Sequence, residues 1–164
     1  MLWIYNQPLT VENQRDIALC YILADKFLVE AFKNMVVDTA KVECRKKTLS
    51  MDGLVELYEN ALSQSPLANY LWAQLAFELI NAGFEKYISQ VQYVDGGGAL
   101  SKLLQAPENL ITFMRVLDQA WNKYGRREDL DPSTMDGCLY HEHKETKPCK
   151  AVKMKVTVGK WWSQ

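Results

Sequence analysis

The stretch PLANYLWAQLAFELI, residues 66–80, decides the expected fold. Its side chains are apolar on nearly every side of a helical projection, which is typical of a helix surrounded by the rest of a protein. Ser65 precedes it as an N-cap residue and Pro66 suits the first helical position, while residues 81–83 (Asn-Ala-Gly) provide a stop. We therefore expect this helix to be the most buried one in the chain.

Apolar residues recur at helical spacing in other segments as well. The i, i+3, i+4, i+7 pattern predicts helices around residues 17–24, 32–39, 54–62 and 107–124, and a weaker pattern covers residues 84–94. Residues 152–158 instead alternate apolar and polar side chains, as in a half-buried strand. The sequence therefore predicts a mostly α fold, a helical bundle with a small C-terminal β-element. Its core is expected to include Leu71, Leu75, Phe113 and Leu117.

Composition places the chain among globular proteins, because 48% of its 164 residues are hydrophobic and 24% are charged. No apolar run approaches the roughly 20 residues that span a bilayer, and the first residues lack the pattern of a signal peptide. We expect a cytoplasmic or nuclear protein, in which clustered cysteines bind metal more often than they form disulfides. Residues 138–164 carry six lysines and two acids, so the C-terminal part is basic.

The stretch CLYHEHKETKPC, residues 138–149, holds both histidines and two of the four cysteines. Zinc prefers four nitrogen or sulfur ligands in a tetrahedron. In an extended strand His141 and His143 point to the same face, so both can approach one ion. Cys138 can reach it from a turn, and Cys149 can close the fourth side. Four ligands leave no position for water, so the spacing favours a structural zinc site.

Three other interpretations of this stretch remain open from the sequence. It can be a surface turn without metal, a Cys138–Cys149 disulfide, or a catalytic Cys/His pair. A reducing compartment disfavours the disulfide. Catalysis by a nucleophile needs a base oriented by a third group, and the neighbouring sequence does not indicate which residue that would be.

Several motifs together resemble a known family. The stretches LWIYNQPL and CYILADKFLVEAFKNMVVD are similar to the end of a BTB/POZ domain of the kind found in filamentous fungi, through Trp3, Tyr5, Ala24, Asp25, Lys26, Phe32 and Asn34. The SPLANYL helix is similar to the helix that follows this domain. The C-x-Y-H-x-H…C pattern, after Asp131-Pro132, also recurs in that group.

The resemblance implies that the chain corresponds to the C-terminal part of such a protein. Residues 1–47 would be helices ending the BTB domain, residues 48–125 the helical region after it, and residues 126–164 a loop, the Cys/His stretch and the strand. The β-sheet expected before Trp3 is absent, so the family's dimer surface and cullin contacts are not carried over. Glu30 also replaces the proline usual before the second helix.

The function expected from these observations is a non-enzymatic protein–protein interaction module with a structural zinc held by Cys138, His141, His143 and Cys149. Apolar residues at Trp3, Ile4 and Tyr5 are expected to dock on a second copy, on another protein chain, or on the helices of residues 51–124 in the same chain. In the first two cases the partner would be a second copy or another chain. We expect no catalytic residues, no other cofactor and no membrane partner. The alternative is nucleic-acid binding through the basic, zinc-containing C-terminal tail.

Overall fold

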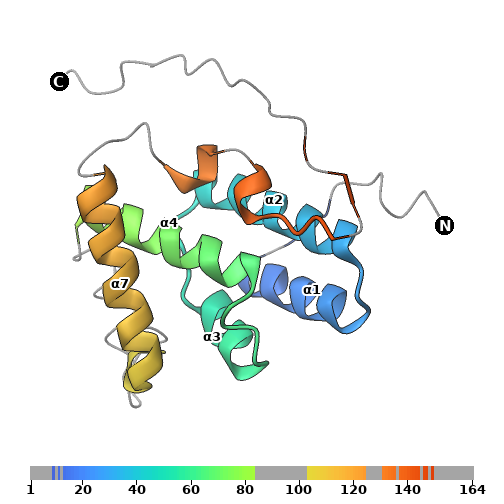
Figure 1. Cartoon of the computed structure of the whole chain (residues 1–164), viewed down its shortest axis with the longest axis horizontal. Coiled ribbons are helices and arrows are strands. Elements are labelled where there is room, and N and C mark those ends of the chain that lie inside the picture. Colours follow the sequence, from blue (N-terminus) through green and yellow to red (C-terminus); the bar gives the residue numbers. More distant parts are fainter. Residues whose placement is uncertain are drawn as a thin grey trace.

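The protein is mostly helical in the residues that its computed structural model describes, which are 9, 11, 13–83, 103–124, 131–135, 137–144, 146, 147 and 149. The helices are α1 (Gln14–Lys26), α2 (Glu30–Lys46), α3 (Asp52–Glu59), α4 (Pro66–Ala82) and α7 (Pro107–Tyr124), followed by the 3-10 turns η4 (Pro132–Thr134) and η5 (Gly137–Tyr140) (Figure 1). The predicted mostly α fold is confirmed. The expected strand at 152–158, the helix at 84–94 and Trp3, Ile4 and Tyr5 lie outside the described residues. Within the described residues, no helix is long and apolar enough to cross a membrane.

Helix α4 begins and ends where the sequence predicts. The Ser65 side chain accepts a hydrogen bond from the backbone N–H of Ala68, and Pro66 occupies the first turn. Gly83 follows with a φ of 81°, in the left-handed region that side chains with a Cβ avoid. These two ends fix the length of the helix around which the core is built.

The core surrounds α4, as its apolar sequence predicts. Trp72 and Leu75 are 0% exposed. The Trp72 ring packs edge-on against Tyr58 of α3 at 6.1 Å and tilted against Phe113 of α7 at 5.6 Å between ring centroids. Of the residues predicted to share the core, Leu71, Leu75 and Phe113 are buried in one cluster, and the half-buried Leu117 packs against it. One side chain of α4 therefore joins three helices.

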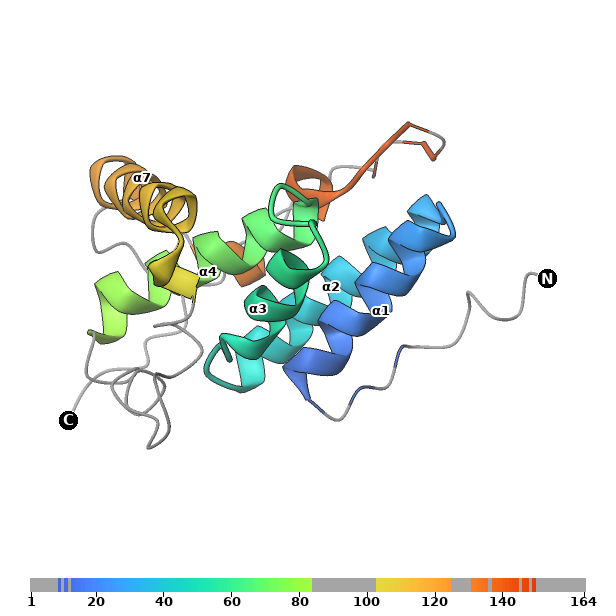
Figure 2. The ribbon, with the colours of Figure 1, turned by 90° about the horizontal axis from the view of Figure 1, so that it is seen from below.

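Helices α1 and α2 form an antiparallel pair, and α3 packs against α1 (Figure 2). Gly53 allows the close approach of α3, since a Cβ at this position would lie 3.2 Å from the carbonyl oxygen of Gln14. The apolar pattern predicted a third helix extending to residue 62, but α3 ends at Glu59. Ala61 adopts a left-handed φ of 59° just beyond it, and this conformation cannot continue a right-handed helix.

Helix α7 crosses α4 at the end of the molecule away from α1 (Figure 2). Its long apolar stripe, expected from the sequence, is only partly used for packing. Phe113 and Ala120 are buried against the core, whereas Met114 and Trp121 are 57% and 58% exposed. The helix therefore presents apolar side chains on two sides, of which one faces solvent.

Candidate metal centre

A row of polar side chains along α2 holds the segment that follows α7. This α2 polar stripe is made of residues spaced four, four, three and four apart, namely Glu30, Asn34, Asp38, Lys41 and Arg45. At 3.6 residues per turn these positions fall within about 80° of one another around the helix. The described residues between 131 and 149 lie along α2, on its side away from α3 (Figure 1).

The first half of the segment is bound through its backbone carbonyl groups. Lys41 Nζ donates to the carbonyl oxygen of Met135 at 2.5 Å, and Arg45 Nε donates to that of Ser133 at 2.9 Å. The Asp131 side chain accepts from the N–H of Ser133 at 2.8 Å and so starts η4. The bond to Met135 offsets part of the cost of burying the Lys41 ammonium group, since Lys41 is only 5% exposed.

The second half of this segment binds α2 through Glu142, which contacts Asn34 and Lys33. Asn34 donates through Nδ2 to the Glu142 carbonyl at 2.8 Å and accepts at Oδ1 from the Glu142 N–H at 2.9 Å. The buried Lys33 ammonium lies 2.7 Å from the Glu142 carboxylate and 3.2 Å from that of Asp25. Burial alone would lower the pKa of Lys33, but the hydrogen bonds and charges of these two carboxylates outweigh burial and raise it. Lys33 is therefore held in its charged form.

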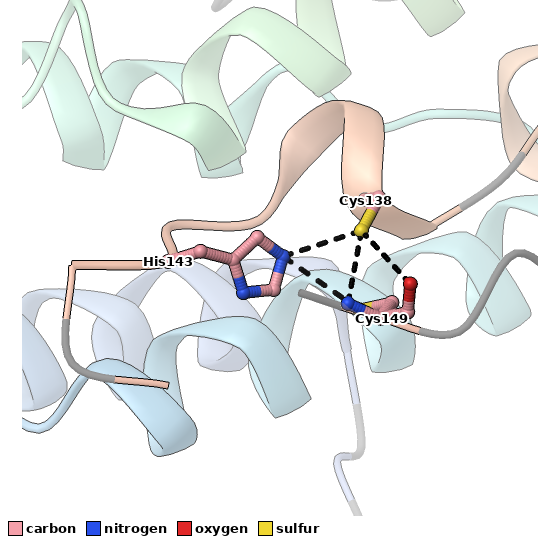
Figure 3. A group of neighbouring side chains, drawn as sticks. All are labelled: Cys138, His143 and Cys149. Carbon is pink, nitrogen blue, oxygen red and sulfur yellow. Dashed lines mark hydrogen bonds between the residues drawn. The ribbon is translucent and has the colours of Figure 1, made fainter. Parts of the chain in front are cut away.

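This anchoring brings three metal-binding side chains together. The ligand atoms of Cys138, His143 and Cys149 all lie within 4.8 Å of one another. His143 Nε2 is 3.3 Å from Cys138 Sγ and 3.7 Å from Cys149 Sγ (Figure 3). Bond lengths of 2.0–2.3 Å in a tetrahedral site imply ligand–ligand separations of about 3.5 Å. The three side chains are therefore close enough together to hold a metal ion.

His141, the fourth predicted ligand, contacts one of these three residues, Cys149, through its side chain. Its Nδ1 lies 3.1 Å from Cys149 Sγ, but it is not among the three residues whose ligand atoms are all mutually close. The ring centroids of His141 and His143 are 6.0 Å apart. The structure thus places all four predicted residues in one neighbourhood, with three ligand atoms already clustered.

The cysteines differ in their surroundings, although all four are free of disulfides. Cys138 Sγ accepts a hydrogen bond from the backbone N–H of Cys149 at 3.1 Å. Cys44 is instead buried in the core, and burial raises the pKa of its thiol to about 12. Cys20 lies on α1, where burial and then the charge of Asp16 raise its pKa. Only Cys138 and Cys149 belong to the cluster.

The Cys/His cluster could be predicted from the sequence, but the residues of α2 that contact it could not. Asp38 contacts His141 directly, and Glu30 accepts a hydrogen bond from the Thr146 hydroxyl, which contacts His143. Asn34 binds the backbone of Glu142, between the two histidines. The signal available in the sequence was the polar spacing of the α2 polar stripe, which runs beside the buried positions Val36 and Val37. Such a stripe is also typical of a solvent-exposed helix face, so it did not point to the cluster.

Comparison with known proteins yields no relative for this chain. No protein-family model matches it, and no curated protein or solved structure matches it.

Proposed function

We propose that the cluster holds a structural zinc ion, with Cys138, His141, His143 and Cys149 as the ligands. Two thiolates and two imidazoles are a donor set that zinc favours. The observation that supports it is the clustering of the ligand atoms of Cys138, His143 and Cys149 within 4.8 Å of one another. Because four protein ligands fill a tetrahedron, the ion would have no open position for substrate, and its role would be to hold the segment in place.

Purified protein is expected to contain about one zinc ion per chain, because one set of four ligands is present in the cluster. Metal analysis after purification without chelators measures this content. Cys138→Ser and His143→Ala should each reduce it to near zero, since losing one of four ligands opens the site. Cys20→Ser, which changes a thiol on α1, should retain the wild-type content. Wild-type protein without zinc would contradict the proposal.

We further propose that the chain is a non-enzymatic protein–protein interaction module, corresponding to the region after the BTB domain in fungal BTB/POZ proteins. The observation that supports interaction is an α1 apolar stripe, formed by Leu19, Leu23, Phe27 and Leu28. These side chains are 44%, 50%, 66% and 77% exposed. An exposed row of large apolar side chains on a soluble surface is typical of an interaction site.

Leu28 is the most informative member of the α1 apolar stripe. Its φ is 54°, and its N–H and that of Val29 close the end of α1 on the carbonyl groups of Asp25 and Ala24. Glycine is the usual residue at such a position, because a Cβ in the left-handed conformation costs about 1 kcal/mol. A leucine that strains the backbone and yet lies in solvent does not serve the fold of the monomer, which favours a role in binding.

The spacing of the α1 apolar stripe suits a second copy of the same chain. Leu19 and Leu23 on α1 and Phe27, its C-cap residue, follow one another every four residues. A two-fold axis passing near Leu23 would place Leu19 of each copy against Phe27 of the other in an antiparallel helix pair, and such an isologous contact is self-complementary. The lysines on which a nucleic-acid-binding alternative depends lie mostly at residues 150–164, outside the described residues.

Sedimentation over a wide concentration range should show a monomer–dimer equilibrium that the α1 apolar stripe controls. Phe27→Ser is expected to weaken self-association at least about tenfold, as for a central interface aromatic. Leu28→Gly should also weaken it while stabilising the monomer by about 1 kcal/mol, so unfolding cannot explain the loss. Ile111→Ser, an equally exposed site on α7, is the control. A wild type that stays monomeric would contradict the second copy as partner.

A further inference from the structure

Each histidine of the cluster has one ring nitrogen facing a cysteine and the other facing a group that α2 holds. His141 presents Nδ1 to Cys149 Sγ and Nε2 to Asp38 Oδ1, both at 3.1 Å. His143 presents Nε2 to Cys138 Sγ at 3.3 Å and Nδ1 to Thr146 Oγ1 at 3.2 Å. The two rings therefore turn different nitrogens toward the cysteines, Nδ1 in His141 and Nε2 in His143, although the residues are only two positions apart.

The proton of His143 is fixed by a chain of hydrogen bonds that ends at Glu30. The Thr146 hydroxyl has one hydrogen, and two oxygens that can only accept lie near it, Glu30 Oε1 at 2.5 Å and the Glu142 carbonyl at 3.3 Å. Its hydrogen is therefore given to an oxygen and is not available to His143. The bond between His143 and Thr146 then requires a hydrogen on Nδ1, which leaves the lone pair of Nε2 facing the sulfur atoms.

The proton of His141 is fixed more directly. A carboxylate can only accept, so the 3.1 Å contact with Asp38 requires a hydrogen on His141 Nε2. The neutral ring then carries its lone pair on Nδ1, on the side of Cys149. A histidine that binds metal commonly donates its other N–H to a carboxylate in this way, and the carboxylate fixes the tautomer.

Glu30 is built into the structure for this role. It is 5% exposed, and its carboxylate accepts from the backbone N–H groups of Lys144 and Thr146 at 2.8 and 2.9 Å as well as from the Thr146 hydroxyl. The same carboxylate therefore orients the His143 ring through Thr146 and binds the backbone of the segment. Docking of the segment on α2 and formation of the metal site depend on the same bonds.

We infer that α2 selects opposite tautomers for the two histidines, so that His141 binds the metal through Nδ1 and His143 through Nε2, with Asp38 and Glu30 as positioning residues. This inference rests on the proposed metal site. The residues of α2 would then orient the metal ligands without binding the ion themselves. The inference also implies that ion binding stabilises the contact between the Cys/His segment and α2.

The tautomers are measured directly by long-range ¹H–¹⁵N correlation spectra of the imidazole rings in zinc-loaded protein. We expect the proton on Nε2 of His141 and on Nδ1 of His143. Spectra in which both histidines bind zinc through the same type of nitrogen would overturn the inference. Spectra that show no zinc-dependent change in either ring would overturn the proposed metal site as well.

Metal affinity tests the positioning residues. Glu30→Gln, Thr146→Val and Asp38→Ala should each weaken Co²⁺ and Zn²⁺ binding about 10–100-fold in chelator competition, with the half-exposed Asp38 at the lower end. Glu43→Gln is the matched control, because Glu43 also lies on α2 but pairs only with Lys46 among the ion pairs of the described residues. Circular dichroism checks that each variant folds. Wild-type affinity in all three variants would overturn the inference while leaving the metal site intact.

Trypsin gives an independent measure of how strongly zinc stabilises the Cys/His segment on α2. The Lys144 side chain is exposed, but its backbone N–H is bound to Glu30. Cleavage after Lys144 should be slow in zinc-loaded wild type, and at least about tenfold faster after chelation or in Glu30→Gln. Equal cleavage rates with and without zinc, in a protein shown to bind zinc, would overturn the inference that zinc stabilises the segment on α2.

Discussion

Removal of zinc is expected to lower the free energy of unfolding by about 4 kcal/mol, when the loaded protein is compared at a free zinc concentration of about 1,000 times its Kd. An ion bound only by the folded chain stabilises it by mass action. The cluster meets this condition, because its geometry depends on bonds to α2 that an unfolded chain cannot make. Urea unfolding in a zinc buffer and in excess chelator measures the difference.

Cysteine variants separate this effect from a general effect of chelator on the protein. Cys149→Ser removes a ligand and should unfold at the lower, chelated midpoint whether or not zinc is present. Cys20→Ser keeps the cluster and should respond to zinc as the wild type does. A wild type whose unfolding midpoint is the same in zinc and in chelator would show that no ion contributes to its stability.

The helices were predictable because their signals are local. Ser65, Pro66 and Gly83 bound α4 in the structure as they do in the sequence, and α7 begins at Pro107. The end of α3 was not predictable, because Ala61 takes a left-handed conformation that alanine rarely adopts. The neighbouring sequence contains no glycine that would indicate such a conformation. Nor does periodicity say which apolar face of a helix has a neighbour, so the exposure of Trp121 on α7 required the structure.

The candidate metal ligands could be named from the sequence because they too are close together in it, whereas the residues of α2 that contact them could not. The four residues of the cluster lie within twelve positions of one another, so their spacing alone suggests a common ion. Asp38 is 103 residues from His141, and Glu30 is 116 residues from Thr146. Contacts across such distances follow from the packing of whole helices, and a single sequence carries no local signal for them.

Replacing Trp72 by alanine is expected to cost about 3–5 kcal/mol of unfolding free energy, the range for a buried tryptophan. The side chain is fully buried, contacts the rings of Tyr58 and Phe113, and donates from Nε1 to the Tyr58 hydroxyl at 2.9 Å. Its loss would leave a cavity where α3, α4 and α7 meet and would remove the donor to a half-buried hydroxyl. Urea unfolding of the zinc-loaded variant measures the cost.

Two variants divide this cost into its parts. Trp72→Phe retains most of the apolar volume but loses the hydrogen bond to Tyr58, so it should cost roughly 1–3 kcal/mol, less than the alanine variant. Trp121→Ala, at a position 58% exposed on α7, should change the free energy by no more than about 0.5 kcal/mol. If Trp72→Ala proved as mild as Trp121→Ala, the packing of α7 and α3 on α4 would have to be rejected. Such a result would also remove the basis for placing the two sides of α7 as buried and exposed.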